Sequence, residues 1–238
     1  MSRPAMLGLA LLGAAAGAGG MWLADRVAPG DLTGADRVRI ERVVRDYVLA
    51  HPEILPEAME KLQQREAAKA VASRRGAIEQ PYESAWIGNP DADVTLVEFY
   101  DYNCGYCRAS LPTIERLVRE DPKLRVVFRE LPVLAPSSRT AARAALAAAK
   151  QGKFKAFHDA LYARGQVSDA TIADAARAAG VNVAAIPDDA DDAIRQNLTV
   201  AEALGINGTP SWVIGDQVLT GALPIDRLKD AIAKARAR

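Results

Sequence analysis

Two cysteines three positions apart are the feature that most constrains this chain. Its 238 residues contain no other cysteine, and the pair stands in the sequence Cys104-Gly105-Tyr106-Cys107. A disulfide ring this small removes little entropy from the unfolded chain, so added stability is a poor reason for the pair. The two histidines, His51 and His158, both lie far from the cysteines in the sequence, so the spacing typical of a zinc site with two cysteines and two histidines is missing. The spacing therefore indicates redox chemistry carried by the two sulfurs.

The residues around the pair predict a strand before it and a helix after it. The run Val94 to Tyr100 is apolar and β-branched, as in a central buried strand. Apolar side chains then recur at helical spacing: Cys107, Leu111, Ile114, Leu117 and Val118. At a helix start, unpaired N–H groups and the helix dipole stabilise a thiolate, so we expect Cys104 to be the nucleophile. Cys107, one turn further in, is expected to resolve the mixed disulfide without any cofactor.

Two sulfurs can hold a soft ion such as Cu(I), which leaves a copper-binding protein as an alternative from another functional class.

The thirty basic and thirty acidic residues balance, and no basic block stands out. The electrostatic pattern of a nucleic-acid binder is therefore missing, and no nucleic-acid partner is expected.

Glu98 is the first candidate residue outside the motif. It lies in the middle of the predicted strand, between Val97 and Phe99. Burial there would raise the pKa of its carboxyl, which suits a group that exchanges a proton with Cys107. An edge strand on which Glu98 faces water is the alternative.

The second candidate is Gly208-Thr209-Pro210, which comes just before an apolar strand. Proline at a strand entrance removes a ladder donor, and a tight turn of this kind tolerates a cis bond. His51 and His158 lie far from the cysteines in the sequence and are interpreted as structural.

The remaining pattern predicts an α/β domain over residues 81–238. A second strand, Arg125 to Leu131, follows the predicted helix, and strand, helix, strand in this order implies parallel pairing. Residues 137–205 are helical and read as an insertion. The sheet resumes with Trp212 to Ile214 and a hairpin at Gly215-Asp216, and a last helix opens at Pro224.

The amino terminus predicts export. After the basic residue Arg3, Ala5 to Ala24 carry no charge. Met6 to Leu12 fits the core of a signal peptide, and Ala16-Gly17-Ala18 offers small residues for cleavage. Twenty helical residues rising about 1.5 Å each also reach roughly 30 Å, so a retained membrane anchor stays open as the alternative. Either way, residues 1–27 direct the chain to the periplasmic side, where disulfides persist.

Residues 28–80 predict a short helical region. Its first helix carries an apolar stripe: Ile40, Val43, Val44, Tyr47 and Val48. A second helix is expected from near Pro56 to Arg75, with residues 76–81 as a linker. Two short helices with one modest stripe cannot form a core of their own, so they either fold back on the main domain or pair with other copies of the chain.

These motifs together resemble the DsbA family of thioredoxin-fold proteins, over roughly residues 81–235. The residues that carry the resemblance are Glu98-Phe99, Asp101 to Cys107, Gly152-Lys153-Phe154, Phe157-His158 and Gly208-Thr209-Pro210. The resemblance implies a thioredoxin fold with a helical insertion, with Cys104 as nucleophile, Cys107 as resolving thiol and Glu98 as buried acid. It also implies that Thr209-Pro210 is a cis-proline loop that lines the substrate groove, together with Gly105 and Tyr106.

Residues 36–75, which include Tyr47 to Leu55, resemble the amino-terminal region of ScsC and Com1 type proteins, which can self-associate. The dipeptide Gly105-Tyr106 departs from the Pro-His of the oxidase DsbA and matches the isomerase DsbC, and Thr209 also departs from DsbA. The sequence thus predicts an exported, oligomeric protein-disulfide isomerase or reductase, with a DsbA-like oxidase as alternative. Its expected partners are exported client proteins and a membrane protein that recycles the cysteines.

Overall fold

The structure is a computed structural model that describes residues 33–237. It divides into two compact units, of which the first ends at Met59 and the second begins at Glu60. The predicted export segment, residues 5–24, lies outside the described residues. Within residues 33–237, no helix has both the length and the apolar character needed to cross a bilayer.

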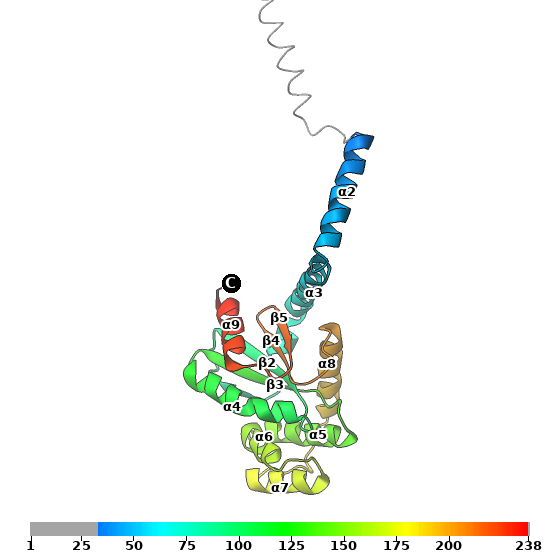
Figure 1. The fold of residues 1–238 in the computed structure, drawn as a ribbon. Coiled ribbons are helices and arrows are strands. Elements are labelled where there is room, and N and C mark those ends of the chain that lie inside the picture. The colour runs from blue at the N-terminus through cyan, green and yellow to red at the C-terminus, as the bar shows by residue number, and fades with distance from the viewer. Residues whose placement is uncertain (1–32, 238) are drawn as a thin grey trace, which may run out of the picture. The chain divides into compact units, whose positions relative to one another are not determined.

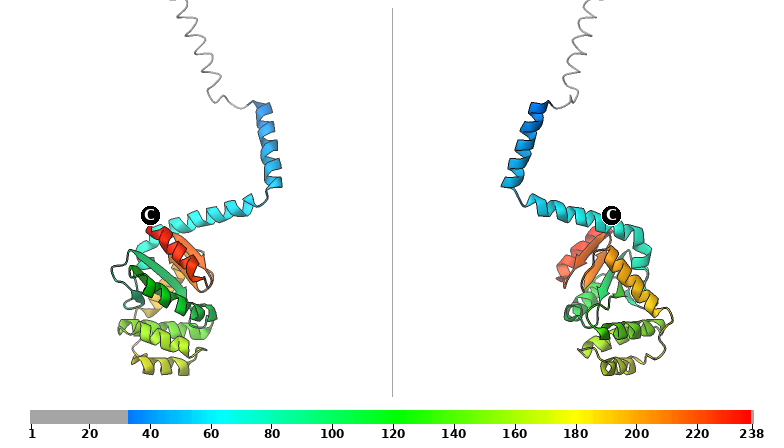
Figure 2. Two further views of the ribbon diagram at one scale, coloured as in Figure 1. Left: turned by 60° about the vertical axis from the view of Figure 1, so that its left-hand side comes forward. Right: turned by 90° about the vertical axis from the view of Figure 1, so that its right-hand side faces the viewer.

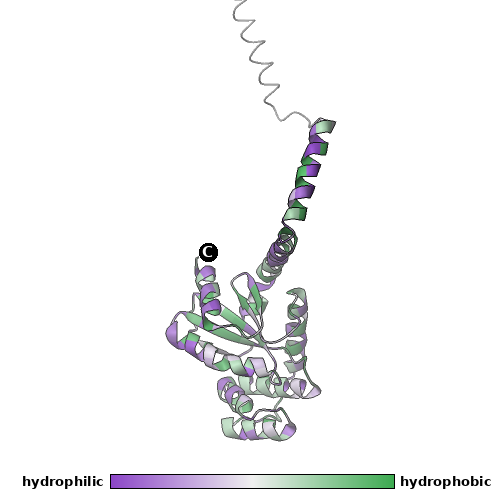
Figure 3. Ribbon diagram, viewed as in Figure 1, coloured by the Kyte–Doolittle hydropathy of each residue, from purple (hydrophilic) through white to green (hydrophobic). Residues whose placement is uncertain are grey.

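The first unit contains helix α2, Gly34–Ala50, and the beginning of helix α3, Ile54–Glu79. The Thr33 hydroxyl accepts the Asp36 N–H at 3.2 Å and caps the start of α2. No residue of α2 is buried, and its apolar side chains alternate with hydrophilic ones along the helix (Figure 3). The exposed apolar side chains are Val38, Ile40, Val43, Val44, Tyr47 and Leu49. Four residues of the predicted stripe, Ile40, Val43, Val44 and Tyr47, are thus exposed in the single chain, whereas the fifth, Val48, is half-buried.

The second unit is built on a five-stranded sheet with the order β1-β3-β2-β4-β5. Its strands are β1 (Trp86–Gly88), β2 (Val94–Tyr100), β3 (Leu124–Glu130), β4 (Ser211–Ile214) and β5 (Gln217–Thr220). The pair β2 and β3 is parallel, as predicted, and the other neighbours are antiparallel. The edge strand β1 was not predicted, because three residues are too few to show a periodicity.

Six helices surround this sheet: α4 (Gly105–Glu120), α5 (Pro136–Lys150), α6 (Phe154–Ala163), α7 (Asp169–Ala179), α8 (Ala190–Ala203) and α9 (Ile225–Arg236). Helices α5 to α8 are the predicted helical insertion. Ser168 caps the start of α7, and Gly180 ends it in the left-handed conformation, φ +65°. Figures 1 and 2 show α5, α6 and α7 gathered at one end of the sheet. The predicted α/β thioredoxin fold with an insertion is confirmed.

The central strand β2 is buried on both faces and divides the core into two. Val97 and Phe99 point to one face, where side chains of α3 and α8 cover them. Leu96 and Tyr100 point to the other face, which is covered by α4, α9 and the insertion. Because side chains alternate along a strand, Glu98 shares the second face with the redox motif.

Helix α3 runs on to Glu79, through residues that the sequence analysis placed in a linker. Val71 and Ile78 of α3 are fully buried against the sheet. The buried Arg129 guanidinium of β3 donates to the carbonyl oxygens of Ile78 at 3.0 and 3.1 Å and of Gln80 at 2.5 Å. These contacts satisfy carbonyls at the end of the helix, which explains why it continues past Gly76.

Candidate active site

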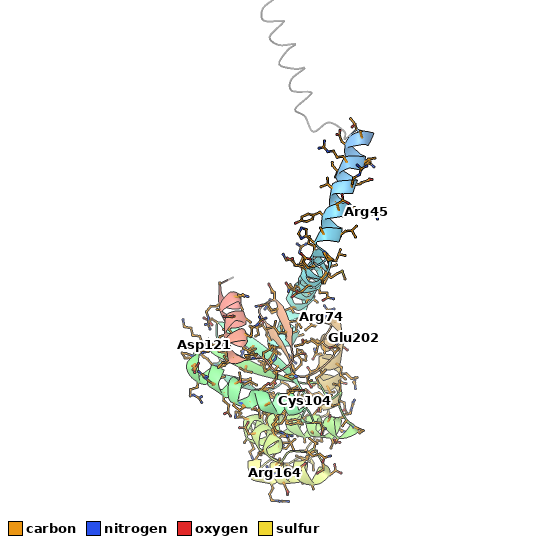
Figure 4. All side chains as sticks on the ribbon, in the orientation of Figure 1. Arg45, Arg74, Cys104, Asp121, Arg164 and Glu202 are labelled. Atoms are coloured by element: carbon orange, nitrogen blue, oxygen red, sulfur yellow. The ribbon has the colours of Figure 1, made fainter. Side chains whose placement is uncertain are left out.

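Cys104 is the N-cap residue of α4, as predicted. Its backbone is extended, with φ −82° and ψ 110°, and its sulfur accepts the Cys107 N–H at 3.3 Å. The Cys104 thiol donates to the Thr209 carbonyl oxygen at 3.2 Å. Figure 4 labels Cys104 at one end of α4 and Asp121 at the other. The helix start therefore presents a backbone donor to the Cys104 sulfur, the arrangement that stabilises a thiolate.

Cys107 differs from Cys104 in its surroundings. Both cysteines are free and buried, but Cys107 lies within α4 on its buried face, whereas Cys104 is the N-cap residue of that helix. Burial raises the pKa of the Cys107 thiol far above its usual value, and the charge of Glu98 raises it further. The pair is thus chemically unequal in the direction that an attacking and a resolving thiol require.

Glu98 is 1% exposed on the central strand, which rules out the alternative of an edge residue facing water. Its Oε1 has no hydrogen-bond partner, and no basic side chain of the described chain pairs with it. Burial raises the pKa of this carboxyl well above its usual range, and the charge of Cys104 adds to the effect. Since Glu98 also raises the pKa of Cys107, it is electrostatically coupled to both sulfurs.

The predicted loop before β4 lies against the motif. The Thr209–Pro210 peptide bond is cis, and its Thr209 carbonyl is the oxygen that contacts the Cys104 sulfur. The Thr209 hydroxyl is buried without a hydrogen-bond partner. The fold thus brings together Cys104, Cys107, Glu98 and the cis-proline loop.

Gly105 and Tyr106 form the exposed outer side of the motif. The Tyr106 side chain is 71% exposed, and a Cβ at Gly105 would meet no atom within 4 Å. These two positions are open to a partner, and their role in substrate binding stays a prediction.

A buried polar chain beside the motif was missed by the sequence analysis. The Tyr102 hydroxyl lies 3.1 Å from His158 Nδ1 and 3.3 Å from the Tyr100 hydroxyl, which in turn contacts the Glu130 carboxyl. Burial lowers the pKa of His158 to about 3, so the ring is neutral at neutral pH. His158 is far from the cysteines in the sequence, but its contact with Tyr102 places it beside the turn that precedes Cys104. His51 lies at the end of α2.

The described residues contain no group of three or more His, Cys, Asp or Glu side chains that could hold a metal ion. Exchange between thiols and disulfides needs only the sulfurs and a proton acceptor. With two unequal thiols and the buried Glu98 carboxyl, the site is suited to thiol-disulfide exchange.

Solved structures support the same conclusion. A linker-deletion mutant of Proteus mirabilis ScsC is 32% identical with a TM-score of 0.71, over 88% of this chain and 99% of that chain. A periplasmic thioredoxin-like protein from Salmonella enterica serovar Typhimurium is 34% identical with a TM-score of 0.65, over 69% and 96%. The thiol-disulfide exchange protein alpha-DsbA2 from Wolbachia pipientis is 27% identical with a TM-score of 0.66, over 73% and 97%.

Curated relatives include longer proteins. The Na(+)/H(+) antiporter NhaA 1 of Salinispora arenicola is 29% identical over 156 residues, which are 62% of this chain. The chain spans only 24% of the length of this antiporter.

Two family models match the chain in succession. Residues 36–69 match the copper resistance protein ScsC N-terminal domain, in the region where the sequence resembles ScsC. Residues 95–233, more than half of the chain, match the DSBA-like thioredoxin domain. With its free cysteine pair at a helix start beside a cis-proline loop, the chain belongs to the family of DSBA-like thioredoxin domains.

Proposed function

We propose that this protein reduces and reshuffles incorrect disulfides in other exported proteins. The observation that carries the proposal is the inequality of the two thiols. Cys104 receives the Cys107 N–H at the start of α4, whereas burial raises the pKa of the Cys107 thiol. In such a pair, the reactive thiol can attack a client disulfide, and the second thiol can then release the client from the mixed disulfide.

In the first step, the Cys104 thiolate attacks one sulfur of a client disulfide. A new S–S bond forms between Cys104 and the client, and the other client sulfur leaves as a thiolate. In the reductive outcome, Cys107 passes its proton to a base and attacks the Cys104 sulfur, which frees the second client thiol and leaves a Cys104–Cys107 disulfide. The ionised form of Glu98 is our candidate for that base, since this carboxyl interacts electrostatically with both sulfurs. In the isomerising outcome, a client thiolate displaces Cys104 and the net redox state is unchanged.

Two features favour isomerase or reductase activity over oxidase activity. The first is the Gly105-Tyr106 dipeptide, which matches an isomerase in the resemblance described above. The second is the exposed apolar stripe of α2, which is suited to self-association. An oligomer would present several redox sites to one misfolded client and so raise their effective concentration.

The activity is tested by incubating scrambled ribonuclease with the reduced protein in a glutathione buffer. We expect faster recovery of ribonuclease activity than in buffer alone, and a Cys104→Ser variant should match the buffer. Recovery at the buffer rate with the wild-type protein would contradict the isomerase proposal. A reduction potential near about −120 mV would instead favour the disulfide-donating oxidase.

Self-association through α2 gives a separate prediction. Replacing Val43 and Tyr47 with Gln should reduce the mass in sedimentation equilibrium from that of an oligomer to that of one chain, because the apolar contact area is lost. Replacing Arg42 and Arg45 with Gln is the matched control, because it keeps the apolar stripe. A wild-type protein that sediments as a single chain would contradict the prediction, as would an unchanged mass in the Val43 and Tyr47 variant.

The proposal places the protein in the periplasm, the compartment named for the Salmonella relative. Residues 5–24 then serve as the export signal, either removed or kept as a membrane tether. Proteins of this kind act on client cysteines and are recycled by a redox partner. In our proposal that partner is a membrane protein.

A further inference from the structure

We infer that Asp101 is a positioning residue that fixes Cys104 at the start of α4. Asp101 follows β2 directly and is 1% exposed. No basic side chain of the described chain forms an ion pair with it, although a buried carboxylate is costly to desolvate. The inference rests on the proposed function only for the identity of the reaction that Cys104 performs.

Four donors surround the Asp101 carboxylate. Oδ1 accepts the Asn103 N–H at 2.8 Å and the Ser138 hydroxyl at 2.7 Å. Oδ2 accepts the N–H groups of Val133 at 2.9 Å and Leu134 at 3.0 Å. Hydrogen bonds from several donors stabilise the ionised form of a carboxyl group and explain how one can be kept buried here.

These donors belong to three different parts of the domain. Asn103 lies in the turn that leads to Cys104, Val133 and Leu134 lie in the loop between β3 and α5, and Ser138 lies in the first turn of α5. One carboxylate therefore joins the turn before the nucleophile to the adjacent loop and to the insertion.

The Asp101 backbone continues this connection to the redox cysteines. Its carbonyl oxygen accepts the Cys104 N–H at 2.9 Å and the Tyr162 hydroxyl at 3.0 Å. A backbone hydrogen bond from Asp101 also acts on Cys107 and lowers the pKa of its thiol, against the larger effect of burial. The surroundings of both Cys104 and Cys107 thus depend on the position of the Asp101 backbone.

The position of Cys104 matters because its sulfur has contacts on two sides. It lies 3.3 Å from the Cys107 nitrogen and 3.2 Å from the Thr209 carbonyl oxygen. Hydrogen bonds weaken steeply with distance and angle, so a displacement of about 1 Å would remove the donor that stabilises the thiolate. Loss of the Asp101 carboxylate should therefore change the reactivity of Cys104 as well as the stability of the fold.

Asparagine cannot replace Asp101 in either orientation of its amide. Each carboxylate oxygen accepts two donors, whereas the amide NH₂ of asparagine is itself a donor. At the Oδ2 position the NH₂ would face two N–H groups, and at the Oδ1 position it would face an N–H and a hydroxyl. The Asp101→Asn variant keeps the volume and removes only this complementarity.

The test measures the rate at which iodoacetamide alkylates Cys104 in the reduced full-length protein as a function of pH, with peptide mass spectrometry to separate the two cysteines. In Asp101→Asn we expect slower alkylation of Cys104, because the sulfur is no longer held against the Cys107 N–H. The rate at pH 6 should fall about ten-fold, the size of effect expected when one hydrogen bond to a charged group is lost. The equilibrium with glutathione should shift towards the oxidised protein, because the thiolate form is less stabilised.

Ser168→Ala is the control, since it removes the N-cap of α7 and lowers stability without touching the cysteine turn. Its alkylation profile should match the wild type. If Asp101→Asn does not fold, Tyr162→Phe is tested in its place, because it removes only the hydrogen bond to the Asp101 carbonyl oxygen. The rate of Cys104 alkylation at pH 6 should then fall about two- to three-fold. A wild-type profile in folded Asp101→Asn, or in Tyr162→Phe where the first variant is unfolded, would overturn the inference.

Alkylation needs no client protein. A wild-type protein that fails to repair scrambled ribonuclease would therefore overturn the proposed function and leave the positioning role of Asp101 standing. The converse result, active wild type with an unaffected Asp101→Asn profile, would remove only the positioning role.

Discussion

Replacing Cys104 with Ser is expected to abolish disulfide exchange, with a loss of at least about 10³-fold in the rate of client reduction, because a serine hydroxyl is not a nucleophile towards disulfides under these conditions. Replacing Cys107 with Ala should have a different effect. The Cys104 attack remains, but the resolving step is lost, so mixed disulfides with clients should accumulate.

Both variants can be compared in one experiment. Proteins are alkylated in the native compartment, separated without reductant, and the adducts are identified by mass spectrometry. The double variant Cys104→Ser with Cys107→Ala is the control and should trap nothing. Adducts on Cys107 in the Cys104→Ser variant, at a level similar to those on Cys104 in Cys107→Ala, would contradict the assigned order of the two thiols.

Glu98→Gln is expected to slow closure of the Cys104–Cys107 disulfide by about 10²-fold, because it removes the carboxyl that we assign as proton acceptor for Cys107. Stopped-flow measurement of the reaction between the reduced protein and oxidised glutathione separates this step from the first attack, which should be nearly unchanged. Equal slowing of both steps would indicate that Glu98 affects the site through structure alone.

The same substitution should change how stability depends on pH. Burial raises the pKa of Glu98 in the folded protein, whereas an unfolded Glu titrates near about 4.3. The folded state therefore keeps a proton that the unfolded state loses. The stability linked to Glu98 is full below the unfolded pKa and is lost as the pH rises through the folded pKa, at no more than about 1.4 kcal/mol per pH unit.

Glu98→Gln should remove this loss, so the variant should be more stable than the wild type at neutral pH and similar to it near pH 4. Urea unfolding of the reduced proteins between pH 4 and 8 measures the difference. Burial also raises the pKa of Glu130, so the free energy of unfolding should still depend on pH in both proteins. An identical pH dependence for the two proteins would show that Glu98 ionises in the folded state as freely as in the unfolded chain.

Local sequence rules predicted the parts of the fold and site that depend on neighbouring residues. The apolar run of β2 and the helical spacing after it placed Cys104 at a helix start. Ser168 and Gly180 define the two ends of α7 through equally local contacts, since capping depends on residues within one turn.

The remaining features depend on contacts between residues far apart in the chain. Glu98 is buried because β2 lies between β3 and β4, and no local pattern distinguishes it from an edge residue. Three of the four donors to Asp101 lie more than thirty residues away, at Val133, Leu134 and Ser138. His158 likewise contacts Tyr102 across 56 residues. The length of α3 likewise depends on Arg129 of a distant strand. Such long-range pairings need the topology before they can be predicted.

The central claim is that the two thiols are unequal, with Cys104 reactive and Cys107 held in reserve. Alkylation of the reduced wild-type protein by iodoacetamide at neutral pH, followed by peptide mapping, tests it most directly. The account predicts rapid labelling of Cys104 and almost none of Cys107, whose thiol is buried with a raised pKa. Labelling of both cysteines at similar rates, or of Cys107 first, would contradict it.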